Sequence, residues 1–189
     1  SEWVGQPRIP GATLAVFDAD HAAGFAFGAR DLRENTPATP DTLIGIGSCT
    51  KSFTGVAILQ LAEAGDLAVT DDVSAYVPHL RDAPGPPVTI RELLTHSSGM
   101  PSDGMATALI GRAMDVDDTE VPLSSDEDFA RHVGGSVDER VLGLDDPFFY
   151  YNSGFTLLGE VVEAVSGRAY AEYVREEIQE PLGMERSTF

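Results

Sequence analysis

The sequence predicts an α/β (α+β) fold in which an antiparallel N-terminal hairpin precedes a large helical lobe. Segments of β type are confined to the first 47 residues, and helical patterns dominate from residue 48 onward. No internal repeat or low-complexity segment interrupts them. A chain of 189 residues is long enough for one domain with a real core. We therefore expect one domain over 1–189, with strands in 1–47 and helices in 48–189.

Two short apolar segments predict the hairpin. Residues 13–17 and 24–28 read as strands, and the acidic residues of 18–20 provide a turn between them. Residues 31–41 are mostly polar and contain two prolines, and they lead into the apolar stretch 43–47.

A central helix is predicted from Ser48 to about Ala64, where Gly65 stops it. Its apolar residues go almost all the way round, which predicts burial on most sides. The N-terminus of this helix would then present Ser48 from the middle of the fold.

The remaining helices follow from local start and stop signals. Thr89 and Glu92 have the spacing of a capping box. The acid-rich stretch 115–128 is interpreted as a solvated loop, with a docking patch as the alternative. Helices are expected at 72–76 (before Pro78), 89–95, 125–133, 153–165 and 169–179.

The charge balance is strongly acidic. The chain has 31 acidic and 12 basic residues, a formal net charge of −19, and a single lysine among those basic residues. Such a field repels nucleic acid and anionic membranes, so we expect no nucleic-acid partner. Many acids with almost no lysine are typical of a halophilic protein; an acidic mesophilic protein is the alternative.

Neither a membrane span nor a signal peptide is visible in this chain, so we expect a soluble protein. The chain begins with Ser rather than Met, and its compartment is therefore unknown. Its single cysteine, Cys49, cannot form an internal disulfide, and no Cys/His spacing resembles a metal site. We expect neither a metal nor a cofactor.

The single lysine, Lys51, lies three residues after Ser48. Residues at this spacing share a helical face, so the amine would lie beside the serine hydroxyl. Unlike arginine, a desolvated lysine can lose its proton and activate a serine nucleophile. The alternatives are that Ser48 is only a helix cap and that Lys51 only extends to solvent. The neighbouring Gly45 and Gly47 would allow close backbone approach.

A second polar group stands before the helix predicted at 153–165. The phenol of Tyr150 could share a proton with a lysine amine, and the Asn152 amide could hold that amine or bind a substrate carbonyl. The alternatives are that Asn152 or Ser153 is only a helix cap. Cys49 is interpreted as a small buried residue rather than a second nucleophile.

These motifs, taken together, resemble the penicillin-recognising serine hydrolases, nearest to the β-lactamase-related group of class C β-lactamases, D,D-peptidases, D-aminopeptidases and esterases. The resemblance implies a β-lactamase/transpeptidase-like fold. The matching blocks occur in the family's order over almost the whole chain: 10–12 (PGA), 36–43 (TPATPDTL), 46–54 (IGSCTKSFT), 88–101 (VTIRELLTHSSGMP), 148–160 (FFYYNSGFTLLGE) and 180–184 (EPLGM).

The resemblance implies a role for each site residue. Ser48 is the acylated nucleophile, Lys51 its proton-relay partner, Tyr150 a proton shuttle and Asn152 a substrate-orienting amide. The middle residue of this motif, often Ser, is Tyr151 here, so the local packing is expected to differ. His96 lies in a matching block and is interpreted as structural.

One departure concerns the family's third motif, a Lys-Thr-Gly or His-x-Gly sequence on a strand that lines the site. It is not found after Asn152, and residues 132–134 (HVG) precede Tyr150 within a predicted helix. The C-terminal strands of the sheet are also absent from this chain. We therefore expect an incomplete domain, a hairpin with an unpaired edge and an exposed apolar face, and poor catalysis by this chain alone.

The sequence thus predicts a serine hydrolase that forms an acyl-enzyme with an amide or ester substrate. The alternatives are a penicillin-sensor-like module that acylates without turnover and a catalytically incomplete structural fragment. A C-terminal fragment or a second chain that completes the fold is a possible partner. The substrate and the oligomeric state stay open.

Overall fold

The computed structural model describes residues 9–83, 85–100, 125–138, 140–141, 143 and 148–188. Its contacts divide the chain into two compact units, Ser1–Gly47 and Ser48–Phe189. Of the predicted acidic loop at 115–128, only 125–128 lie within the described residues, and they begin a helix.

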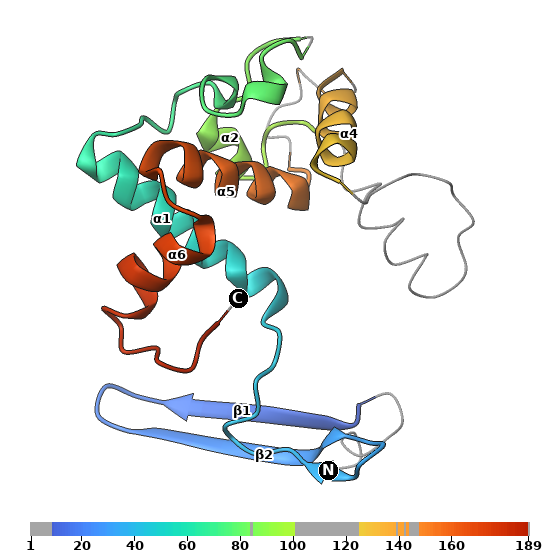
Figure 1. The fold of residues 1–189 in the computed structure, drawn as a ribbon, viewed down its shortest axis with the longest axis vertical. Coiled ribbons are helices and arrows are strands. Elements are labelled where there is room, and N and C mark those ends of the chain that lie inside the picture. The colour runs from blue at the N-terminus through green and yellow to red at the C-terminus, as the bar shows by residue number, and fades with distance from the viewer. Residues whose placement is uncertain are drawn as a thin grey trace. The chain divides into compact units, whose positions relative to one another are not determined.

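The first unit is an antiparallel sheet of order β1-β2-β3, with β1 at Gly11–Phe17, β2 at Ala22–Asp31 and β3 at Thr36–Pro37 (Figure 1). The predicted hairpin is confirmed, and β2 is longer than expected. The carboxylate of Asp18 shapes the turn, since it accepts the backbone N–H groups of Asp20 and His21 at 2.9 and 2.8 Å.

One face of this hairpin is apolar and exposed. Leu14 pairs with Phe25, and Ala12 pairs with Phe27, so these side chains share a face. Leu14, Phe25 and Phe27 are each about half exposed. Among the described strands, β1 pairs on one side only. The exposed face and the unpaired edge agree with the sequence prediction.

In the second unit, the predicted central helix is α1, at Thr50–Ala64, and a 3₁₀ turn, η1 at Gly47–Cys49, precedes it. Gly65 ends α1 in the left-handed conformation, as predicted. The prediction of burial on most sides is wrong. Ile58 and Leu61 are buried, whereas Val56 and Leu59 on the other side are exposed. An all-round apolar pattern cannot show which face the chain covers.

A short helical region follows α1. The predicted helix at 72–76 is a 3₁₀ turn, η2 at Val73–Ala75, and Pro78 begins a further turn, η3 at Pro78–Leu80. Helix α2 spans Ile90–Leu94. Its predicted capping box is confirmed, because the Thr89 N–H donates to the Glu92 carboxylate at 2.8 Å and the Glu92 N–H donates to the Thr89 hydroxyl at 3.2 Å.

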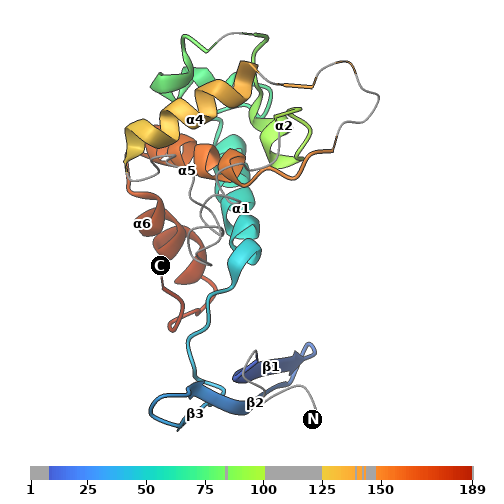
Figure 2. The same cartoon turned by 90° about the vertical axis from the view of Figure 1, so that its right-hand side faces the viewer.

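Helix α5, at Asn152–Ser166, begins one residue before its predicted start and is contacted by helices from both sides of it in the sequence. Helices α1, α2 and α6 (Tyr170–Val174) pack against it, as both views of the fold show (Figure 1; Figure 2). Helix α4 spans Asp126–Asp138 and is longer than predicted. A π-helix, η4 at Arg175–Gln179, continues α6. The core is formed by apolar side chains of these elements, including Ile58, Ile90, Leu93, Leu157, Leu158, Val161, Val162 and Val174.

The arrangement bears on two further features of the sequence. Residues 132–134 lie inside α4 and not on a strand, as predicted. Within the part of the chain that the structure describes, no helix combines the length and the apolar character needed to cross a membrane.

Candidate active site

Ser48 lies in the 3₁₀ turn that leads into α1, and the turn places it beside Lys51. In a 3₁₀ helix, side chains at positions i and i+3 are aligned more closely than in an α-helix. The amine Nζ of Lys51 is 3.5 Å from Ser48 Oγ, at the upper limit of a hydrogen bond. The structure assigns the N-cap of α1 to Cys49, so the alternative that Ser48 caps this helix does not hold.

Glycine is required before Ser48 for a reason that the sequence analysis missed. Gly47 has a φ of +53°, in the left-handed region that favours glycine. A Cβ atom added to Gly45 or Gly47 would meet no described atom within 4 Å. No described backbone therefore approaches these two glycines closely, and the demand at Gly47 is conformational.

Tyr150, which is distant from Ser48 in the sequence, contacts the same serine. Its hydroxyl donates a hydrogen bond of 2.8 Å to Ser48 Oγ, across 102 residues of sequence. Tyr150 lies two residues before the start of α5, so this contact brings the segment before α5 close to the start of α1. Of the two groups that contact the serine oxygen, the phenol is closer than the amine of Lys51.

Asn152 is the first residue of α5, and its side chain holds the lysine. Its Oδ1 atom accepts a hydrogen bond of 2.5 Å from Lys51 Nζ. The structure assigns the N-cap of α5 to Tyr151, so Asn152 is not the cap. The structure thus brings Ser48, Lys51, Tyr150 and Asn152 together in one continuous set of contacts.

Aromatic rings surround the lysine amine. Lys51 Nζ lies 4.9 Å from the ring centre of Tyr150 and 5.5 Å from that of Phe155, within the range of cation–π attraction. Sequence reasoning missed Phe155. The signal was its position three residues after Asn152, which places both side chains on one face of α5. Lys51 is half-buried, so it does not simply extend into solvent.

Two further residues were judged from the sequence, with different outcomes. Cys49 is exposed, and the prediction of a buried residue is wrong because the residue lies in the turn before α1 rather than on its packed face. The ring of His96 packs against that of Tyr150, with 4.4 Å between their centres. The position of His96 agrees with a structural role.

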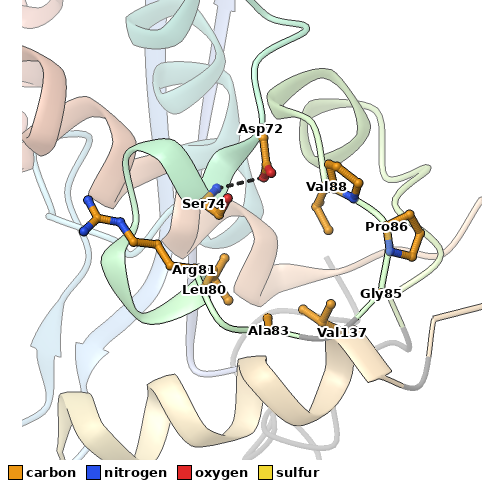
Figure 3. Close-up of a pocket in the computed structure, with 10 residues that line it drawn as sticks. Asp72, Ser74, Leu80, Arg81, Ala83, Gly85, Pro86, Val88 and Val137 are labelled. Atoms are coloured by element: carbon orange, nitrogen blue, oxygen red, sulfur yellow. Dashed lines mark hydrogen bonds between the residues drawn. The ribbon is translucent and has the colours of Figure 1, made fainter.

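A separate cavity of about 150 Å³ lies among η2, η3 and the loop before α2 (Figure 3). Its lining includes Leu80, Val88 and Val137, and the carboxylate of Asp72 accepts the N–H of Ser74 at 3.0 Å. Asp72 is thus occupied in capping η2. None of the predicted site residues lines this cavity.

Known proteins are similar to this chain in sequence and in fold. The family model described as beta-lactamase matches residues 2–189. Protein flp of Staphylococcus aureus strain MW2 is 32% identical over 187 residues, which cover 96% of this chain and 35% of that protein. The octameric penicillin-binding protein homologue of Pyrococcus abyssi is 40% identical with a TM-score of 0.84, and the match covers 94% of this chain and 40% of that one.

A third similar protein has an amidase name. The D-amino acid amidase of Ochrobactrum anthropi SV3, solved with L-phenylalanine, is 26% identical with a TM-score of 0.70, over 93% of this chain and 46% of that one. The chain thus spans less than half the length of these relatives. Because the family model covers nearly all of its residues, the chain belongs to the beta-lactamase family, with the α/β fold of the penicillin-binding proteins and class C β-lactamases.

Proposed function

We propose that this chain carries the nucleophile of a serine hydrolase, and that Ser48 is acylated by an amide or ester substrate. Family membership supports a serine-hydrolase-like fold. The observation that carries the proposal is the convergence of two proton-carrying groups on one oxygen: the Tyr150 hydroxyl at 2.8 Å and the Lys51 amine at 3.5 Å from Ser48 Oγ. A serine hydroxyl needs such a neighbour to become nucleophilic.

The proposed acylation begins when Ser48 Oγ attacks the substrate carbonyl carbon. The hydroxyl proton of Ser48 passes to the pair formed by Lys51 and Tyr150. The tetrahedral intermediate then collapses, the bond to the leaving group breaks, and the pair returns the proton to the departing amine or alcohol. Water hydrolyses the resulting ester of Ser48, which releases a carboxylic acid and restores the hydroxyl.

Two features of the structure support charge development at this position. The N-terminus of α1, a helix of 15 residues, lies directly after Ser48 and favours a developing negative charge. The hydrogen bond from Lys51 to Asn152 holds the amine near the serine, so little reorganisation is needed when the substrate arrives. We assign Asn152 to holding Lys51 and, through the donor side of its amide, to the substrate carbonyl.

The names of the relatives favour a substrate class. One similar structure is a penicillin-binding protein homologue, and another is a D-amino acid amidase. Both names point to amide bonds, either the strained amide of a β-lactam or that of a D-amino acid amide. We therefore propose these amides as first substrates, with simple esters as the more reactive alternative.

The test is a time course of intact mass after the chain is mixed with benzylpenicillin or with a D-amino acid ester. Matched variants are Ser48→Ala and Ser52→Ala, the second removing an exposed serine from the first turn of α1. We expect one adduct that forms on the parent chain and on Ser52→Ala but not on Ser48→Ala, and then decays. An adduct that persists would support acylation without turnover. An adduct that survives Ser48→Ala would overturn the assignment of the nucleophile.

A further inference from the structure

We propose that His96 is a positioning residue that holds Tyr150 against Ser48. This role rests on the proposed function of Tyr150 and deepens it. His96 lies 54 residues before Tyr150 in the sequence, just after α2. It contacts the backbone next to Tyr150 and the aromatic ring of Tyr150.

The backbone contacts are made on both sides of Tyr150. The carbonyl oxygen of His96 accepts the N–H of Phe149 at 2.9 Å, and its Nδ1 atom accepts the N–H of Tyr151 at 3.1 Å. One residue therefore binds the backbone N–H groups of the residues before and after the tyrosine. These bonds limit the movement of the Tyr150 main chain relative to α2.

The ring of His96 also constrains the Tyr150 side chain. The two ring centres are 4.4 Å apart with an angle of 33° between the planes, which is a tilted stack. The rings of Phe155 and Phe148 also lie near the imidazole, with their centres 5.1 and 5.7 Å from its centre. The stack on His96 packs one face of the Tyr150 ring, and this packing favours the orientation in which the Tyr150 hydroxyl points toward Ser48.

The backbone at His96 shows that the side chain matters. Its N–H donates to the Leu93 carbonyl at 3.3 Å, and the Ser97 N–H donates to the Glu92 carbonyl at 2.8 Å. These bonds form a Schellman motif, in which the left-handed position is usually glycine. His96 occupies that position with a φ of +58°, which costs free energy for a residue with a Cβ atom. A role in ending the helix alone would be served better by glycine.

The hydrogen bond from the Tyr151 N–H also determines the tautomer of the neutral His96 ring. Nδ1 accepts a hydrogen bond, so the proton of the neutral ring must be on Nε2. An asparagine at this position tolerates the left-handed conformation and offers a carbonyl oxygen as an acceptor. A glycine suits the backbone but offers neither an acceptor nor a ring. The pair His96→Gly and His96→Asn therefore separates positioning from helix termination.

The experiment measures the second-order rate of labelling by a fluorophosphonate in the 189-residue chain and its variants, each first shown to be folded by circular dichroism. Misplacement of a catalytic group by about 1 Å costs on the order of 10²-fold in rate. We expect His96→Gly to label about 10- to 100-fold more slowly, and His96→Asn to recover a substantial part of the loss. The matched control is His79→Ala. The Nδ1 atom of His79 lies 3.6 Å from the carboxylate of Glu160. Glu160 lies eight residues after Asn152 on α5, so the two residues are roughly 12 Å apart along the helix axis and His79 is remote from the site.

A second readout does not need activity. Amide hydrogen exchange at Tyr151 is expected to be protected in the parent chain and in His96→Asn, and to accelerate in His96→Gly. A folded His96→Gly variant that labels within about twofold of the parent, or that keeps the Tyr151 amide protected, would overturn the positioning role. A parent chain that acquires no label would instead overturn the proposed function, and the catalytic part of this inference with it.

Discussion

The hydroxyl of Tyr150 donates a hydrogen bond of 2.8 Å to Ser48 Oγ, although the two residues are 102 positions apart in the sequence. This contact joins the two halves of the site: the turn before α1 and the segment before α5. The lysine amine lies at the same junction, between the serine hydroxyl and the Asn152 amide. Acylation at Ser48 should therefore depend on both segments.

Removal of the Tyr150 hydroxyl tests its part in proton transfer. Tyr150→Phe keeps the ring that stacks on His96 but loses the donor to Ser48. We expect fluorophosphonate labelling to slow by about 10²- to 10⁴-fold with little change in melting temperature. Tyr170→Phe is the control, because it loses a hydrogen bond to Thr54 (2.7 Å) and about 1 kcal/mol of stability but keeps the labelling rate. Equal rates in both variants would remove Tyr150 from the mechanism.

Lys51→Arg tests whether the amine acts as a base or only as a charge. Arginine keeps the positive charge but stays protonated at ordinary pH. We expect a loss of labelling rate of about 10²- to 10⁴-fold. Arg168→Lys, which exchanges the cation that pairs with Glu176 and Glu177, should leave the rate unchanged. If Lys51→Arg labelled at the parent rate, a role of Lys51 as a proton acceptor would be refuted.

Two glycines of α5 should respond to alanine in opposite ways. A Cβ atom at Gly154 would lie 2.9 Å from Tyr151 Cδ1 and 3.2 Å from Leu93 Cδ2, so Gly154→Ala should lower the free energy of unfolding by about 1–3 kcal/mol. A Cβ atom at Gly159 would lie 3.7 Å from Tyr170 Cδ2, an ordinary contact. Gly159→Ala should raise the free energy of unfolding by about 0.5–1 kcal/mol. Urea unfolding measures both, and equal effects would contradict the packing of Tyr151 on Gly154.

The hydrogen bond of 2.6 Å from Tyr76 to Asp71 should make stability depend on alkaline pH. The Asp71 carboxylate raises the pKa of Tyr76 to about 12, above its ordinary 10. Between these values the unfolded chain loses the tyrosine proton while the folded chain keeps it, so the contribution is complete below pH 10 and is lost as pH rises through about 12. Unfolding in urea between pH 9 and about 12 should show a steeper loss for the parent than for Tyr76→Phe. Parallel curves would refute this linkage.

At acid pH, the same hydrogen bond makes stability change with pH in the opposite direction: stability falls as pH falls. The hydrogen bond from Tyr76, followed by that from the Ala68 N–H, lowers the pKa of Asp71 below its ordinary 3.8. Its contribution to stability is therefore present above that value and is lost as pH falls through the lower pKa of the folded state. Tyr76→Phe should weaken this acid sensitivity also.

Stability in salt tests the halophilic hypothesis. In dilute buffer, the acidic side chains that give the net charge of −19 repel one another. Molar salt shortens the Debye length to about 3 Å and so screens this repulsion. Ion pairs such as those of Arg168 and Arg175 with their glutamates are weakened by salt, but these pairs are exposed, and exposed pairs contribute little to stability. We expect the melting temperature to rise from dilute buffer to molar KCl. Full stability in dilute buffer would refute the hypothesis.

Structural features that depend on residues close together in the sequence could be predicted. The hairpin, the capping box of Thr89 and Glu92, and the end of α1 at Gly65 depend on contacts within a few positions. Ser48 and Lys51 were found in the same way, because a separation of three fixes their distance. Tyr150 and Asn152 were assigned to the site from family resemblance and not from spacing.

Features that depend on distant packing could not be predicted. The exposure of Val56 and Leu59 depends on which elements cover α1, and an apolar pattern on all sides gives no answer. Phe155 lies beside Lys51, and His96 contacts the backbone next to Tyr150. Each of these contacts joins two segments more than 50 residues apart in the sequence. The positive φ of His96 is likewise set by the end of α2 rather than by the identity of the residue.

The most direct test of the nucleophile is peptide mapping after fluorophosphonate labelling in molar salt. The chain offers its own internal comparison, since exposed Cys49 is adjacent to Ser48 and exposed Ser52 follows in the first turn of α1. We expect a single label on Ser48 that disappears in Ser48→Ala and slows in Tyr150→Phe. A label on Cys49 or Ser52, or no label on a folded chain, would contradict the assignment of Ser48 as the activated nucleophile.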